Sequence, residues 1–122
     1  MTTTSARGGL AEAQAESYLQ EQGLTPWTRN YRCKVGELDL IMRDGDYLVF
    51  VEVRLRNNRD YADGLESITA SKQRKLVRAA QFYLQQHQLT DKLPCRFDVI
   101  AMHYTTEQQP VFTWLRNAFD AY

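Results

Sequence analysis

Residues 36–56, GELDLIMRDGDYLVFVEVRLR, read as two apolar strands joined by a tight turn, and this hairpin decides the fold. Gly45 and Asp46 are expected to form a two-residue loop, because a type II′ turn takes glycine at its first central position. Such a loop fixes which residues of the two strands face one another. The predicted facing pairs on one side of the sheet are Arg43 and Leu48, Ile41 and Phe50, Asp39 and Glu52, and Glu37 and Arg54.

The two faces of this hairpin differ in chemistry. One face carries Val49, Val51, Val53 and Leu55 and is apolar along its whole length. The other face is apolar near the turn and becomes acidic and basic at the far end. Since side chains alternate between the faces of a strand, the hairpin is expected to be buried on one side and to open into a polar space on the other.

Asp39 and Glu52 meet at this open end. Directly facing side chains have Cβ atoms roughly 4.5–5.5 Å apart, and like charges at that spacing are destabilising. A divalent cation such as Mg²⁺ would remove the repulsion, and so would a raised pKa on one acid. Two alternatives remain open: solvated acids beside a salt bridge between Arg54 and Glu37, or a three-residue loop that sends the two acids to opposite faces.

The rest of the chain supplies helices and strands on both sides of the hairpin. An α/β fold of the α+β kind follows, with a mixed sheet and the order α-β-β-β-α-β-β. With 122 residues and no repeat or linker, residues 1–122 are expected to form a single domain in which residues 1–8 are flexible. The expected elements are helices over 5–22 and, with Thr69 as N-cap, 70–87, strands over 25–33, 95–104 and 110–115, and a short helix over 116–122.

The overall composition excludes several classes of protein. The formal net charge is +0, so any surface that binds nucleic acid must be local. Cys33 and Cys95 stand too far apart for a Cys-x-x-Cys motif, which argues against a zinc site or a disulfide framework. The sequence has no signal peptide and no apolar run of membrane-spanning length, so a cytoplasmic protein without membrane contact is expected.

An acid on one strand, a hairpin turn, and Glu52-Val53-Arg54 on the next strand resemble the PD-(D/E)xK nuclease superfamily. More closely, GELDLIMRDG, VFVEVRLR, SKQRKL and RFDVIA, in this order, resemble the YraN family of bacterial proteins. The similarity extends from Glu12 to Phe119. It implies a restriction-endonuclease-like core in the bacterial cytosol, similar to archaeal Holliday-junction resolvases, and Mg²⁺- or Mn²⁺-dependent hydrolysis of DNA, with branched DNA as the partner.

The resemblance also implies a role for each matching residue. Asp39 and Glu52 correspond to the metal-binding acids, and Glu12 to an acid that completes the metal shell, although an exposed helix glutamate is the simpler alternative. Arg54 stands where many superfamily members carry lysine. A guanidinium can stabilise charge on the phosphate but cannot act as a base near neutral pH. Arg54 is therefore expected to be catalytic through its charge.

A basic surface is expected between the hairpin and the second long helix. Arg74 and Arg78, taken singly, are better read as parts of a solvated helix face, and Gln73 as either a phosphate ligand or a buried structural hydrogen bond. Asp98 is expected to pair with Arg96. The residues predicted to bind nucleic acid are Arg56, Arg59, Lys72, Gln73 and Lys75.

Three functions compete on these grounds. The first is a metal-dependent endonuclease that acts on branched DNA. A homodimer is compatible with this function, because two symmetric nicks need two sites. The second is a catalytically inactive nucleic-acid-binding module with the same fold, in which Arg54 has ended the chemistry. The third is a protein-interaction domain with purely structural carboxylates.

Overall fold

The computed structural model describes residues 4–56 and 68–120, with side chains from residue 9 onward. The order of elements is α-β-β-β-α-β-β, and the predicted α+β fold with a mixed sheet is confirmed. The elements are α1 (Thr4–Glu21), β1 (Thr25–Cys33), β2 (Gly36–Asp44), β3 (Tyr47–Leu55), α3 (Ala70–Gln86), β4 (Cys95–Tyr104) and β5 (Pro110–Phe119).

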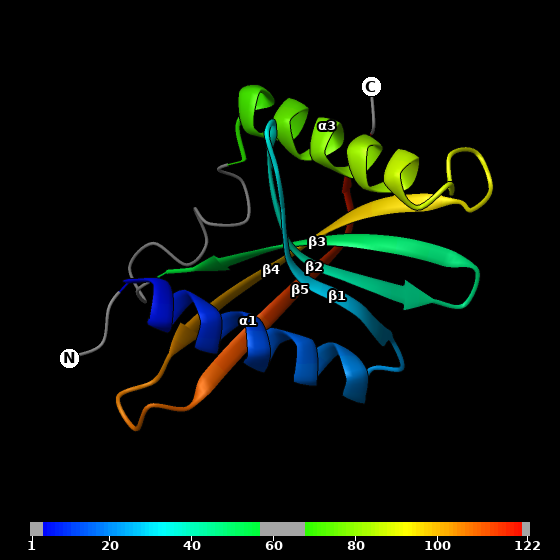
Figure 1. Cartoon of the computed structure of the whole chain (residues 1–122). Helices are drawn as coiled ribbons and strands as arrows, with labels where there is room; N and C mark the ends of the chain where they lie inside the picture. Colours follow the sequence, from blue (N-terminus) through cyan, green and yellow to red (C-terminus); the bar gives the residue numbers. More distant parts are fainter. Residues whose placement is uncertain (1–3, 57–67, 121–122) are drawn as a thin grey trace.

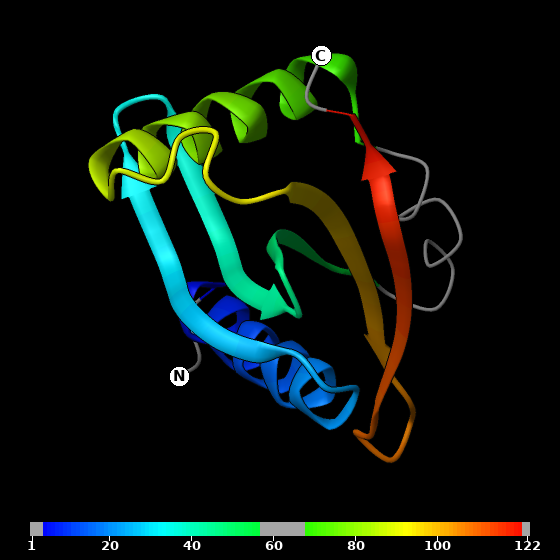
Figure 2. The same ribbon diagram turned by 90° about the vertical axis from the view of Figure 1, so that its right-hand side faces the viewer.

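The five strands form one sheet in the order β1-β2-β3-β4-β5. Only the β3–β4 pair is parallel, and parallel neighbours need a crossover connection, which contains α3. Figure 1 shows α3 over one face of the sheet and α1 over the other, and Figure 2 shows the same arrangement from the side. The sheet is therefore the middle layer of three.

Because both faces are covered, the sheet has a hydrophobic core on each side. On the α3 side, Ile41, Leu48 and Phe50 pack with apolar residues of the helix. On the α1 side, Val49 and Val51 pack with Ala11, Ala15 and Leu19 of α1. The apolar face predicted for the hairpin is thus the α1 side, and the face that carries Glu52 is the α3 side.

Local sequence signals end and begin the helices where expected. Beyond α1, Gly23 has φ +102°, the N–H of Gly23 donates to the carbonyl of Gln20, and the N–H of Leu24 donates to that of Leu19. This is the Schellman arrangement, which needs a left-handed residue that glycine supplies without strain. At α3, the Thr69 hydroxyl accepts the Lys72 N–H at 3.1 Å and caps the helix as predicted.

The hairpin register is the predicted one near the turn. Ile41 faces Phe50 and Arg43 faces Leu48, and the ladder extends as far as Leu40. Gly45 has φ +59°, the left-handed value that a type II′ turn requires at this position. The three-residue loop that would have separated the two acids is therefore excluded.

The prediction of a short helix over 116–122 is wrong for its described part. Residues 116–119 continue β5, with Phe119 paired to Phe97 of β4. The N–H of Asn117 donates to the buried Asp98 carboxylate at 2.9 Å, and the register of β4 with β5 shifts at this point. A bulge held by a buried acid extends the strand, and local helix propensity carries no information about it.

Two further findings, on membrane-spanning helices and on the cysteines, apply to the described residues. Neither α1 nor α3 is long and apolar enough to cross a membrane. Cys33 and Cys95 are both free thiols.

Candidate active site

The backbone of β2 departs from regular alternation at Asp39. Leu38 packs on the α3 side of the sheet and Leu40 on the α1 side, although residues two apart normally share a face. In β1, Asn30 lies next to this point with a left-handed φ of 60°. The Asp39 carboxylate accepts the N–H of Val53 at 2.8 Å, beyond the last β2–β3 ladder pair. The irregularity turns the Asp39 side chain into the gap that opens between β2 and β3.

Asp39 and Glu52 come together in this gap, as the hairpin register predicted. They are 9% and 8% exposed, and they hydrogen-bond to each other. Burial raises the pKa of Asp39 to about 6. Burial, and then the hydrogen bond and charge of Asp39, raise the pKa of Glu52 to about 8. Because two adjacent carboxylates cannot both ionise cheaply in a buried site, the pair retains a proton at neutral pH.

Two cations lie beside the acidic pair. Lys72, in the first turn of α3, places its Nζ 3.4 Å from Oε2 of Glu52, and its side chain is 42% exposed. Arg54 lies two residues after Glu52 on β3. Burial and the nearby charge of Arg56 lower the pKa of Arg54, and the charges of Glu52 and Asp39 offset part of this lowering. The site thus combines two buried acids with two half-buried cations within range of their charges.

Glu12 approaches the pair from α1. Its side chain is half-buried and hydrogen-bonds to Asp39 and Asn30, and burial raises its pKa. Arg29 supplies a partly compensating positive charge. The alternative of a freely exposed helix glutamate does not describe Glu12, because its side chain is half-buried and hydrogen-bonded to Asp39.

Asp39 and Glu52 provide the carboxylate ligands that a hard divalent cation prefers, but they do not form a complete set of ligands. Among residues 4–56 and 68–120, no three or more His, Cys, Asp or Glu side chains are already grouped as a metal site. Mg²⁺, however, is usually held by one or two carboxylates together with water and substrate oxygens. Asp39 and Glu52 offer two carboxylates, and the positive charge of such an ion would favour their ionised forms against the burial that raises their pKa values.

Comparison with known proteins gives the family. The model of "Uncharacterised protein family UPF0102" matches residues 11–102. The chain belongs to the UPF0102 family. This is the YraN family of the sequence analysis, so that prediction is confirmed.

Several relatives match over nearly their full length. A UPF0102 protein of Legionella pneumophila subsp. pneumophila is 48% identical over 118 residues, which cover 97% of this chain and 98% of the relative. A UPF0102 protein of Nitrosomonas eutropha is 48% identical over 120 residues, 98% of each chain. A UPF0102 protein of Nitrosospira multiformis is 50% identical over 114 residues, 93% of this chain and 92% of the relative.

The residues predicted to bind nucleic acid in this UPF0102 chain are placed differently from one another. Lys75 is exposed on α3. Arg56 is half-buried and donates from Nη1 to the carbonyl of Leu55 at 3.0 Å. Gln73 donates from Nε2 to the carbonyl of Ile68 at 3.0 Å, so its structural hydrogen bond is present. Arg59 lies outside the described residues.

One predicted pair is wrong. Glu37 does not face Arg54, because the regular ladder between β2 and β3 ends at Leu40. Glu37 instead faces Arg32 of β1, and the two exposed side chains form an ion pair with Nε 3.3 Å from Oε2. The departure of β2 from β3 at Asp39 removes the partner that was predicted for Glu37.

Asn30 is the site residue that the sequence analysis missed. It hydrogen-bonds to Glu12 and holds the left-handed backbone beside Asp39. A signal was present, because asparagine is depleted in strands but tolerates a positive φ. An asparagine inside an otherwise regular strand is therefore a cue for a local irregularity.

Proposed function

We propose that this UPF0102 chain is a Mg²⁺- or Mn²⁺-dependent endonuclease that hydrolyses DNA phosphodiester bonds, with branched DNA as its preferred substrate. The supporting observation is the Asp39–Glu52 pair, two hydrogen-bonded acids from neighbouring strands, with Lys72 ion-paired to Glu52 and Arg54 within range of the charges of both acids. Structural acids are normally satisfied by donors, whereas these two face each other. The preference for branched DNA comes from the resemblance to Holliday-junction resolvases.

Asp39 and Glu52 would hold the metal, with Glu12 as a further oxygen ligand. A divalent cation there supplies Lewis-acid activation of water and neutralisation of phosphate charge. The guanidinium of Arg54 remains protonated and stabilises the negative charge that develops on the phosphate. Lys72 holds the Glu52 carboxylate in place and presents a second positive charge toward solvent, where the substrate backbone arrives.

A catalytically inactive DNA-binding module is the second candidate. Arg54 favours it, because a guanidinium cannot exchange a proton near neutral pH as a lysine amine can. The two proposals differ in turnover and share the site and its basic surroundings.

The test is cleavage of labelled four-way junction, flap, single-stranded and duplex DNA with Mg²⁺ or Mn²⁺. We expect cleavage by the native protein and a loss of at least about 100-fold in Asp39→Asn and in Glu52→Gln, since each removes one charged metal ligand. Lys92→Gln, an exposed side chain just before β4, where that strand pairs with the turn end of β3, is the control and retains activity. Cleavage that persists in both acid variants would overturn the site, and binding without cleavage would favour the inactive module.

A further inference from the structure

The helix α3 concentrates positive charge in a chain whose formal net charge is +0. Its 17 residues contain no acid, and its basic residues are Lys72, Arg74, Lys75 and Arg78. All of these cations fall in the N-terminal half of the helix, next to the acidic pair. The local charge therefore has the sign and the position that a polyanionic ligand of the site requires.

The core-facing stripe of α3 divides these cations between two flanks. Leu76, Ala79 and Ala80 are buried against the sheet. On one flank, Lys72 reaches Glu52, and the backbone of Lys75 lies against Gly36 of β2. The other flank faces the C-terminal end of β5, which lies beside the start of α3 (Figure 2).

This second flank forms a groove with a distinct lining. The groove encloses about 340 Å³, and its lining includes Gln73, Arg74, Val77, Arg78, Gln81 and Asp120. The arginines and Gln81 are N–H donors suited to phosphate oxygens, and Val77 offers an apolar contact for a sugar. Within residues 4–56 and 68–120, neither Arg74 nor Arg78 forms an ion pair, so both charges are open to a ligand.

We infer that this groove binds the backbone of a DNA arm that extends past the scissile phosphate, with Arg74 and Arg78 as its phosphate ligands. The inference rests on the proposed function for the identity of the polymer. It departs from the simpler reading of both arginines as a solvated helix face. The two residues are one helical turn apart and line one groove, so they can contact successive positions along a single strand.

Asp120 allows the inference to be tested by a change of DNA affinity in the opposite direction. This exposed carboxylate lines the groove and repels a polyanion there. Removing it should strengthen DNA binding, whereas removing the arginines should weaken it. If DNA does not enter the groove, these changes should affect binding no more than equal charge changes elsewhere on the surface.

The test is fluorescence-anisotropy binding of duplex and four-way-junction DNA in EDTA at several salt concentrations. Arg74→Gln/Arg78→Gln should weaken binding and lower the slope of log K against log salt by about 1.8, at about 0.9 for each phosphate that an arginine no longer neutralises. Asp120→Asn should tighten binding. The control Arg32→Gln/Lys92→Gln removes the same charge from other exposed positions and should leave the slope nearly unchanged.

An equal change of slope in the control and in the groove variant would overturn the inference, because net charge alone would then explain binding. Binding of an acidic peptide with the same variant pattern, and no response with DNA, would reassign the groove to a protein partner and also overturn it. EDTA excludes metal-dependent cleavage, so this result stands apart from the nuclease test. Groove-dependent DNA binding without cleavage in Mg²⁺ would keep the inference and remove the catalytic part of the proposed function.

Discussion

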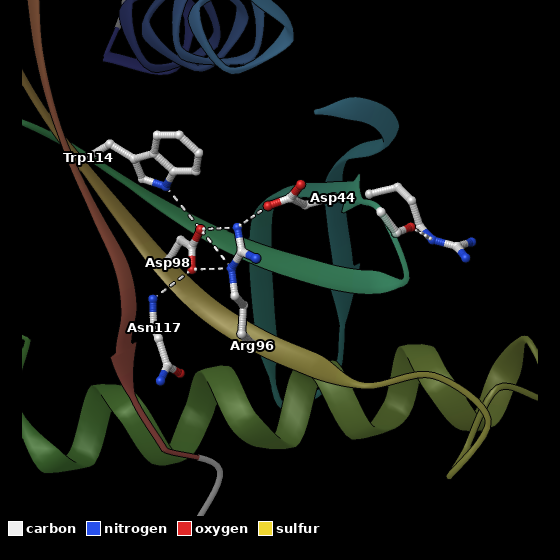
Figure 3. Close-up of polar contacts among 7 residues, drawn as sticks. Asp44, Arg96, Asp98, Trp114 and Asn117 are labelled. Atoms are coloured by element: carbon white, nitrogen blue, oxygen red, sulfur yellow. Dashed lines mark hydrogen bonds and ion pairs between the residues drawn. The ribbon is translucent and has the colours of Figure 1, made fainter. Parts of the chain in front are cut away.

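Asp98 on β4 and the Asp39–Glu52 pair on β2 and β3 are the buried acids of the described residues, and their surroundings differ. Asp98 is 0% exposed and is surrounded by donors, as Figure 3 shows. It accepts the Nε of Arg96 at 3.1 Å, the indole N–H of Trp114 at 2.9 Å and the backbone N–H of Asn117 at 2.9 Å. The sequence analysis expected only the pair with Arg96, which is confirmed.

Asp39 and Glu52 each have another carboxylate as a close neighbour, whereas the neighbours of Asp98 are hydrogen-bond donors. Asp39 accepts one backbone N–H, from Val53, and Glu52 has the partly exposed Lys72. Burial raises the pKa of both acids, and the hydrogen bond and charge of Asp39 raise that of Glu52 further, whereas the hydrogen bond with Glu52 lowers that of Asp39. Burial of an acid thus accompanies two different outcomes: Asp98 organises the β4–β5 edge, and the pair, which has fewer donors, is suited to a ligand cation.

The largest expected effect tests the structural half of this contrast. In Asp98→Asn, an amide N–H₂ replaces one acceptor oxygen, and one of the three donor groups around it loses its partner. We expect a loss of about 3–5 kcal/mol in the free energy of unfolding, the usual cost of breaking a buried charged pair. Urea denaturation at neutral pH measures it.

Asp39→Asn is the matched control for this prediction, since it makes the same chemical change at a buried acid. The new amide oxygen can still accept the N–H of Val53, and the repulsion from Glu52 is removed. We expect the stability of Asp39→Asn to equal or exceed that of the native protein. Equal losses in the two variants would contradict the distinction between a satisfied acid and a strained pair.

The next effect in size is the pH dependence of stability. Asp39 and Glu52 bind protons more tightly in the folded chain, with pKa values raised from 3.8 to about 6 and from 4.5 to about 8. The folded state therefore holds more protons than the unfolded state between about pH 4 and pH 8, and its stability falls as pH rises through this window. We expect a loss of about 3 kcal/mol without divalent cations, on the order of one such shift.

Urea denaturation at pH 5 and pH 9 in EDTA checks this prediction. Glu52→Gln removes the group with the larger shift and should flatten the profile. A native profile that is flat, or that rises with pH over this window, would show that the two acids ionise without cost and would remove the reason for a cation.

The hairpin contains most of what the sequence could predict. Gly45 and Asp46 fix the turn, alternation fixes the faces, and these local rules correctly predicted that Asp39 and Glu52 meet. The caps at Thr69 and Gly23 were equally local signals. Features that depend on residues close together in the sequence could therefore be predicted from it.

The errors arose where distant segments decide the geometry. Glu37 lost its expected partner because β2 leaves β3 at Asp39, beside the left-handed Asn30 of another strand. The end of β5 is a strand because Asn117 bonds to Asp98, 19 residues away in sequence. The approach of Glu12 to Asp39 likewise depends on how α1 packs on the sheet. Periodicity and propensity describe one segment at a time and contain none of these contacts.

The smallest effect concerns the cation itself. An ion that binds the folded chain stabilises it by about 1.4 kcal/mol at ten times its dissociation constant. We expect Mg²⁺ or Mn²⁺ to raise the melting temperature of the native protein, and more so above pH 8 than at pH 6, because Glu52 must lose its proton before it can bind metal. Thermal unfolding with and without each ion measures the shift.

Asp39→Asn and Glu52→Gln should each abolish this shift, and Asp98→Asn should retain it despite its lower starting stability. That crossed pattern separates metal binding from a general effect of salt, which would stabilise all the variants alike. A shift that survives in Glu52→Gln, or that shrinks as pH rises, would place the ion elsewhere. Asp98 and the Asp39–Glu52 pair would then differ only in protonation, and the pair would have no role as a metal site. A proton shared between Asp39 and Glu52 is sufficient to explain a buried acidic pair that binds no cation.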